Sequence, residues 1–88
     1  MPIISIFFGI VVRINFADHN PPHLHAAHGG HEALFDIQTA RVIAGALPRR
    51  ETRYVVEWII KNRVDLMKNW HLAVLGQPTF KIQGPDDE

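Results

Sequence analysis

The chain has no cysteine among its 88 residues. Disulfide frameworks, thiolate nucleophiles and thiolate zinc sites are therefore excluded, so any metal site must use histidine and carboxylate side chains. A long hydrophobic run is also missing, because Arg13 interrupts the apolar N-terminal segment too early for a membrane span, and no positively charged region precedes that segment. We therefore expect a cytoplasmic protein with no membrane partner.

Neither sign of charge dominates the chain. Lysine and arginine number nine, as do aspartate and glutamate, so the overall balance does not favour non-specific nucleic-acid binding. Residues 49–68 are locally basic, with six basic and three acidic side chains. Such charges are typical of the solvated face of an amphipathic helix; the alternative is a phosphate-binding face that uses Arg49, Arg50 and Arg53.

The size and composition indicate one folded domain over residues 1–88. Hydrophobic residues make up 47% of the chain, which is too apolar for general disorder. A chain of this length builds only a modest core, so it is expected to fold alone or as a homodimer.

Residues 1–46 are expected to form mainly strands. From Ile10 to Phe16 apolar residues alternate with Arg13 and Asn15, which is the period-2 pattern of a half-buried strand. Pro21 and Pro22 end that pattern because they lack amide donors. Residues 39–43 predict a further strand.

The pair Gly29-Gly30 predicts a tight hairpin between residues 23–28 and 31–37, because both glycines tolerate positive φ. This register places His23 opposite Asp36 and His25 opposite Leu34. One face then carries the apolar residues Leu24, Ala26, Ala33 and Phe35, and the other carries His23, His25, Glu32 and Asp36.

Residues 47–76 are expected to form two helices. The first has an apolar face at Tyr54, Val55, Trp58 and Ile59, and the second has a buried stripe at Leu66, Trp70, Ala73 and Val74. Asn62 is expected to end the first helix or cap the second, and Gly76 to end the second. Residues 77–83 predict a short edge strand, and residues 84–88 a tail. The predicted fold is α+β: an antiparallel sheet of three to five strands with two C-terminal helices packed on one face.

The side chains best suited to catalysis or metal binding lie in the segment from Asp18 to Glu32, which contains five of the six histidines. His23 and His25 project to the same side of a strand, so they can offer two imidazoles to one divalent transition metal. Asp36, across the hairpin, would be the third ligand or would orient an imidazole by a hydrogen bond. Asp18 and His19 are expected to support the site.

Two alternatives use the same residues without a metal. In the first, one imidazole is a general base and the other, held protonated by Asp36 or Asp18, is a general acid; with Arg49 or Arg50 such a pair would cleave an RNA phosphodiester. In the second, the segment is structural, with Asp18 accepting backbone hydrogen bonds in a rigid turn. His28 and His31, beside the hairpin turn, and His71, on a helix, are expected to lie at the surface outside the site.

The chain resembles, almost from end to end, a small family of uncharacterised bacterial domains. The most specific match is the block Asp18-His19-x-Pro21-Pro22-His23-x-His25-Ala26. The other matching residues are Ile4-Ser5, Phe7 to Ile10, Asp36-Ile37, Leu47 to Arg49, Glu57-Trp58, Leu66, Asn69-Trp70, Ala73, Gln77-Pro78 and Lys81-Ile82. The chain departs from many relatives at Asn62, where histidine is frequent, and at His28, where an aromatic residue is frequent.

The resemblance implies a gene pair, because genes of this family commonly lie beside a second short gene in an arrangement similar to toxin–antitoxin modules. The leading hypothesis is thus a toxin-like or partner-binding component that binds the small protein encoded next to it. The competing hypotheses are a ribonuclease or metal-dependent hydrolase that uses the same residues, and a transcription-associated nucleic-acid-binding module.

Overall fold

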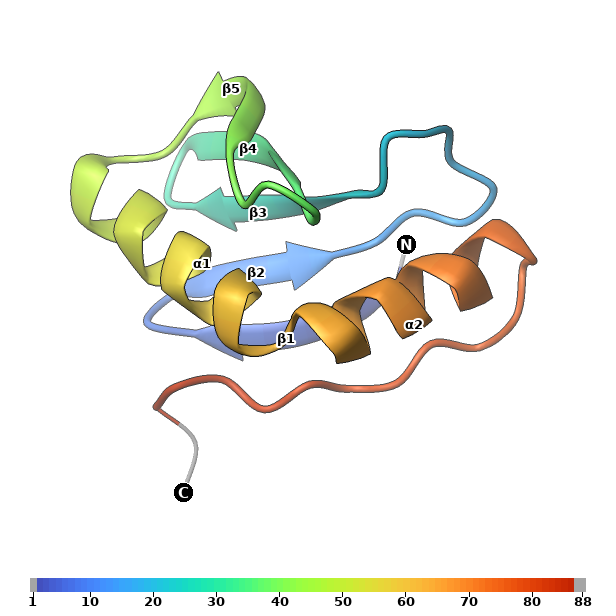
Figure 1. Ribbon diagram of the computed structural model, residues 1–88. Helices are drawn as coiled ribbons and strands as arrows, with labels where there is room; N and C mark the ends of the chain where they lie inside the picture. The colour runs from blue at the N-terminus through green and yellow to red at the C-terminus, as the bar shows by residue number, and fades with distance from the viewer. Residues whose placement is uncertain (1, 87–88) are drawn as a thin grey trace.

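Each strand of the sheet pairs antiparallel with its neighbour in the sequence, in the order β1-β2-β3-β4-β5. The structure is a computed structural model that describes residues 2–86, and two helices cover one face of the sheet (Figure 1). The elements are β1 (Ile3–Phe7), β2 (Ile10–Arg13), β3 (His23–His28), β4 (His31–Asp36), β5 (Val42–Ala46), α1 (Arg49–Lys61) and α2 (Arg63–Val74). The predicted α+β fold is therefore confirmed.

The central hairpin has the predicted register. His23 pairs with Asp36, His25 with Leu34 and His28 with His31, and Gly29 has a φ of +59° in the turn. The predicted core residues Leu24, Ala26, Ala33 and Phe35 are all fully buried. They pack with Ile10, Val12 and Ile14 of β2 and its extension against Val55, Ile59 and Leu66 of the helices.

The fifth strand begins later than predicted, at Val42 rather than at residue 39. The cause is Asp36, whose Oδ1 accepts hydrogen bonds from the backbone N–H groups of Gln38 and Thr39 at 2.8 and 2.9 Å. Ala40, with a φ of +61°, then donates its N–H to the Asp36 carbonyl oxygen. These hydrogen bonds close a turn over residues 36–40, so pairing with β4 resumes only at Val42.

Asn62 lies between the two helices, where it is both the residue that ends α1 and the residue that precedes α2, as predicted. Its Nδ2 donates to the Trp58 carbonyl oxygen at 2.9 Å, and its side chain makes no capping hydrogen bond to α2. Gly76, with a φ of +70°, ends α2 as predicted by donating to the Ala73 carbonyl oxygen. Val74 was wrongly placed in the buried stripe: it is 42% exposed, and Asn69 is buried in that stripe instead.

The predicted strand over residues 77–83 is absent from the described part of the chain. This segment runs beside β1 and makes one backbone hydrogen bond to it, from Ile82 N–H to the Ile4 carbonyl oxygen at 2.8 Å. The rest of the segment is held by side chains of the helices. Asn69 forms hydrogen bonds with both backbone groups of Phe80, and Trp58 Nε1 donates to the Gln83 carbonyl oxygen. The segment therefore covers the β1 edge without becoming a sixth strand.

The end of the described chain is also attached to the sheet. Asp86 accepts a hydrogen bond from the backbone N–H of Phe8, and Gly84 packs so closely on Phe7 that a Cβ would lie 2.7 Å from the Phe7 Cβ. The predicted tail over 84–88 is thus ordered by contacts as far as Asp86, and its last two residues lie outside the described residues. Neither described helix has the length and apolar character that crossing a bilayer requires.

Candidate metal centre

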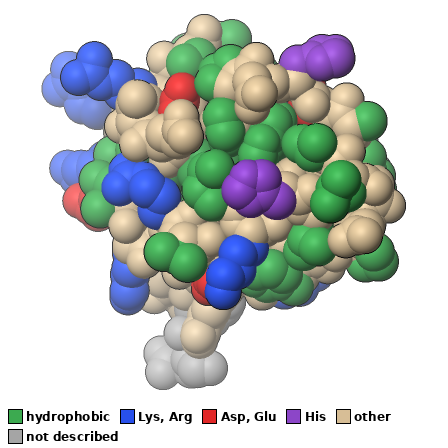
Figure 2. Space-filling view, turned by 45° about the vertical axis from the view of Figure 1, so that its right-hand side comes forward, with side chains coloured by type: hydrophobic (Ala, Val, Ile, Leu, Met, Phe, Trp, Pro, Cys, Tyr) green, Lys and Arg blue, Asp and Glu red, His purple; other side chains and the backbone are tan. Residues whose placement is uncertain are grey.

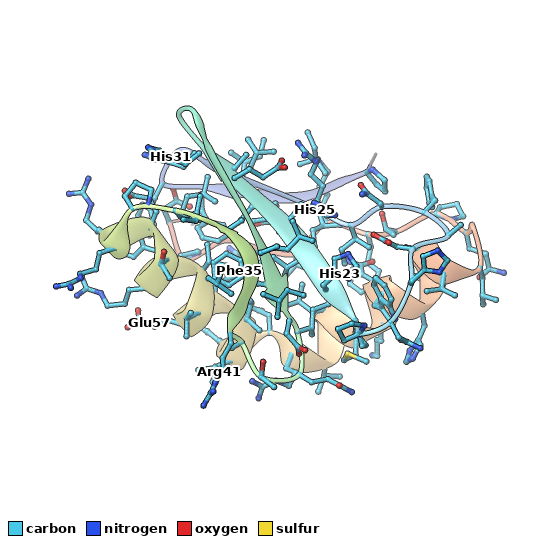
Figure 3. All side chains as sticks on the ribbon, turned by 90° about the horizontal axis from the view of Figure 1, so that it is seen from above. His23, His25, His31, Phe35, Arg41 and Glu57 are labelled. Carbon is cyan, nitrogen blue, oxygen red and sulfur yellow. The ribbon has the colours of Figure 1, made fainter. Side chains whose placement is uncertain are left out.

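Three side chains from two segments converge at the start of β3. His23 and His25 come from the strand itself, and Asp18 comes from the loop between β2 and β3. One ligand atom of each residue lies within 4.8 Å of the other two. Figure 3 shows His23 and His25 on the same strand, at its end away from the His31 turn. The spacing of two residues brings the imidazoles together, as the sequence predicted.

His23 is the most constrained member of the cluster. Its Nδ1 lies 2.8 Å from the Pro21 carbonyl oxygen, and because a carbonyl oxygen only accepts, Nδ1 must carry a proton and donate it. The other ring nitrogen, Nε2, therefore points to Asp18 Oδ2 at 2.9 Å. The ring is almost buried and packs on Trp70 of α2, with a centroid distance of 5.2 Å.

His25 lies beside His23 and is oriented by Asn15. Its Nε2 is 3.0 Å from Asn15 Nδ2 and 3.8 Å from Asp18 Oδ2. Burial lowers the pKa of His25, and the positive charges of His23 and Arg13 lower it further, against the opposing effects of Glu32 and Asp18. The neutral imidazole, which is the form that ligates a metal, is therefore favoured at neutral pH. Its Nε2 accepts a hydrogen bond from Asn15 Nδ2, which a metal at this atom would displace.

Asp18 supplies the negative charge of the cluster. Its partial burial favours the neutral acid, but the hydrogen bond from the His19 backbone N–H, at 2.9 Å, and the positive charges of His23 and His25 together lower its pKa. The ionised carboxylate is thus the resting form. An ionised carboxylate beside a neutral imidazole is the protonation state that metal binding needs.

The donor set fits a divalent transition metal. At metal–ligand distances of about 2.0–2.1 Å, two ligands of a tetrahedral ion lie roughly 3.3 Å apart, and the separations from Asp18 Oδ2 to His23 Nε2 and His25 Nε2, 2.9 and 3.8 Å, bracket that value. The Pro21 carbonyl holds His23 in the tautomer that presents Nε2, as carbonyl groups do for metal-binding histidines. Asn15 Oδ1 is buried without a hydrogen-bond partner beside His25 and is a further oxygen within the site.

Asp36, the predicted third ligand, is not a member of the cluster. It pairs with His23 in the sheet, but its Oδ1 is engaged by Gln38 and Thr39, and the converging carboxylate is that of Asp18. His19 is exposed and contributes its backbone N–H to Asp18.

Arg49 and Arg50 are not brought to the histidines. They begin α1, and the buried Glu51 that follows lies 3.7 Å from His28 Nε2, at the end of β3 opposite His23. Five residue steps along a strand separate His23 from His28, roughly 16 Å. The side chain of His28 is 31% exposed, so it lies at the surface but is partly covered, because its ring packs at Gly9 and bonds the Gly9 carbonyl oxygen.

Two residues of the site were absent from the sequence-based prediction. Arg13 is the register partner of His25, and Asn15 follows two residues later on the same face. The alternation of Ile10, Val12 and Ile14 already directs Arg13 and Asn15 away from the core, so the pattern contained this signal. The contact of Trp70 with His23 has no such signal, because it joins α2 to β3.

A cleft of about 560 Å³ opens beside Asp18. Its walls include Pro21 and Pro22 of the loop together with Trp70 and Val74 of α2. Figure 2, in which the right-hand side of Figure 1 comes forward, shows a face on which a histidine lies among hydrophobic side chains, with lysine or arginine side chains close by. The volume lies within the range of about 300–1,000 Å³ that is typical of ligand-binding clefts.

The comparisons with known proteins identify a family and no activity. The family described as "Domain of unknown function (DUF4160)" matches residues 9–71. The chain belongs to the DUF4160 family. The matched range contains the whole Asp18–His23–His25 cluster and excludes β1 and the segment that covers it. None of the curated proteins, and none of the solved structures, matches this DUF4160 chain.

Proposed function

We propose that this DUF4160 protein is a divalent-metal-dependent hydrolase whose centre is Asp18, His23 and His25. The observation that carries the proposal is the convergence of one nitrogen of each imidazole and a carboxylate oxygen of Asp18 within 4.8 Å of one another. A divalent ion held by Asp18, His23 and His25 would act as a Lewis acid and would lower the pKa of a bound water. Asp18 lines the cleft beside it, so a substrate in that cleft would approach the centre from the carboxylate side.

Phosphodiesters, including RNA, are the substrate class that the surroundings favour. Arg13 lies beside His25 and places a cation next to the centre, although Glu32 accepts a hydrogen bond from its guanidinium. Arginine is suited to a phosphate group because its planar donors match the phosphate oxygens. Arg13 therefore takes the role that the sequence suggested for Arg49 and Arg50.

The biological role that we propose is that of the toxin-like component of a two-gene module, with the small protein of the neighbouring gene as its partner. This part of the proposal is supported by the family resemblance alone. Expression of the chain with and without its genetic neighbour, with growth and co-purification as readouts, tests it. Growth inhibition that the neighbour relieves would support the role, and unchanged growth in both cases would contradict it.

Metal content tests the hydrolase proposal directly. We expect untagged protein to bind about one equivalent of Zn²⁺ or another transition metal, measured by elemental analysis and calorimetry. His23→Ala and His25→Ala should each weaken binding by at least about tenfold, whereas His31→Ala, which changes an exposed histidine beside the hairpin turn, should leave it unchanged. Unchanged binding in the first pair, or no binding in the parent protein, would overturn the proposal.

A second candidate function uses the cluster as a metal-free acid–base pair. It is favoured by the 2.9 Å contact of His23 Nε2 with Asp18, which suits a protonated His23 acting as the acid, and by the lowered pKa of His25, which suits a base. RNA cleavage that persists after dialysis against a chelator, and that both His→Ala variants abolish, would establish this mechanism in place of the metal-dependent one.

A further inference from the structure

The rest of the described chain covers one edge of the sheet and leaves the other uncovered. The β1 edge is covered by residues 77–86, through the hydrogen bonds from Ile82 to Ile4 and from Phe8 to Asp86. The β5 edge lies at the opposite side of the sheet, away from that segment (Figure 1). Within residues 2–86, β5 pairs only with β4. Its outer backbone groups are therefore open to another strand.

The composition of β5 leaves this edge chemically unprotected. Its five residues, Val-Ile-Ala-Gly-Ala, carry no charge and no proline, and all five are exposed, with Val42 at 38% and Ile43 at 47%. Edge strands that avoid pairing usually carry lysine or proline, contain a bulge, or are covered, and of these β5 has only the irregularity at Ile43. The register irregularity at Ile43 and the φ of +71° at Gly45 limit the regular stretch, so the edge suits a short partner strand.

Cations lie at both ends of the strand. Arg41 precedes Val42, and Arg49 follows Ala46 by three residues; both are exposed. Among the residues that the structure describes, neither forms an ion pair, whereas Arg50 is paired with Glu51. Figure 3 shows Arg41 pointing away from the sheet.

We propose that the β5 edge binds an extended segment of another protein, with an apolar centre and acidic residues at both ends, as a sixth strand of the sheet. Backbone hydrogen bonds would supply affinity, and the two arginines would select the acidic flanks. A second copy of this chain fits less well. Antiparallel self-pairing about Ala44 would place Arg41 at the end of the second copy's strand from which its Arg49 follows, so like charges of the two copies would lie at the same end of the paired strands. The inference does not depend on the metal centre, which lies on β3 and the β2–β3 loop.

Two synthetic peptides test the proposal on the full-length, isotope-labelled protein. The acidic probe is Glu-Glu-Thr-Val-Thr-Val-Thr-Glu-Glu, and the basic probe has lysine at the four glutamate positions. In NMR titrations we expect the acidic peptide to shift the backbone amides of residues 42–46 and to bind about tenfold more tightly than the basic one, as several weak ion pairs allow. The double variant R41E/R49E should reverse that preference.

The matched control is Lys81→Glu, a charge reversal at an exposed position beside the covered β1 edge. It should leave both peptide affinities unchanged, and the amide spectra of all variants report whether they fold. Equal affinity for the two peptides, shifts confined to residues outside β5, or concentration-dependent self-association through β5 without peptide would each overturn the proposal. None of these outcomes depends on metal binding or RNA cleavage.

Discussion

His23 and Asp18 face each other with no intervening side chain, Nε2 lying 2.9 Å from Oδ2. Because Nδ1 of His23 already donates to the Pro21 carbonyl, a neutral His23 would direct a lone pair at an ionised carboxylate. Two electron-rich atoms at this distance repel unless a proton or a metal ion lies between them. The pair is therefore the point at which a cation is required, and both candidate mechanisms use it.

Asp18→Asn is expected to weaken Zn²⁺ binding by about 10–100-fold, because the amide keeps the shape of the side chain but removes its negative charge. Titration calorimetry on the folded variant measures this. The matched control is Asp36→Asn, in which the same change is made on the other side of His23. It should leave metal affinity unchanged and cost about 1 kcal/mol of folding stability, since the turn hydrogen bonds to Gln38 and Thr39 lose charge assistance. The reverse pattern would assign the carboxylate ligand to Asp36.

Acidification should destabilise the metal-free protein in two steps. The pKa of His25 is lower in the folded state than its ordinary value of 6.5, so the unfolded chain binds the proton more readily. The stability that neutral His25 contributes is present above pH 6.5 and is lost as the pH falls through the folded pKa. The pKa of Asp18 is likewise lowered from 3.8, and its contribution is lost below that value.

Urea unfolding between pH 4 and pH 8 measures the first step. His25→Gln should flatten the fall in unfolding free energy below pH 6.5, whereas His71→Gln, at an exposed helix position, should keep it. An unchanged slope in the His25 variant would refute this account of the pH dependence.

Gly45→Ala should destabilise the fold strongly. Gly45 has a φ of +71°, and a Cβ there would lie 2.3 Å from the Glu32 carbonyl oxygen of β4, which is too close to be accepted without moving the backbone. We expect a loss above about 2 kcal/mol in chemical denaturation. Gly29→Ala isolates the conformational cost, since Gly29 has a φ of +59° with open space around it, and it should lose only about 1 kcal/mol. Equal losses would mean that β4 adapts to the added methyl group.

Asn69→Ala should detach the segment that covers the β1 edge. The buried amide of Asn69 donates to the Phe80 carbonyl oxygen at 2.8 Å and accepts from the Phe80 N–H at 2.9 Å. Its removal should cost about 2–3 kcal/mol and increase amide exchange at Ile82. Gln77→Ala, which changes an exposed side chain of the same segment, serves as the control. Unchanged exchange at Ile82 would show that the Trp58 hydrogen bond to Gln83 suffices to hold the segment.

Local sequence signals are enough to predict the central hairpin and its two faces. Gly29-Gly30 allows a tight turn, and a shift of one residue would move Leu24 and Phe35 out of the core, so local chemistry and burial select the same register. That register also brings His23 and His25 to one side. The apolar periodicity similarly predicted both helices, and Gly76 predicted the end of the second one. Periodicity and helix-ending residues act over a few residues, so they can be recognised in the sequence.

The carboxylate that lies beside the histidines could not be predicted in this way, because its position depends on long-range packing. The strand register places Asp36 opposite His23 but does not show that its carboxylate accepts hydrogen bonds from the turn that follows. Asp18 lies beside His23 because of the path of the β2–β3 loop, which depends on distant contacts. Ala17 N–H donates to the Ala73 carbonyl oxygen of α2, and Trp70 of the same helix packs on the His23 ring. A loop has no repeating pattern to restrict it, so its position follows from the surface on which it packs.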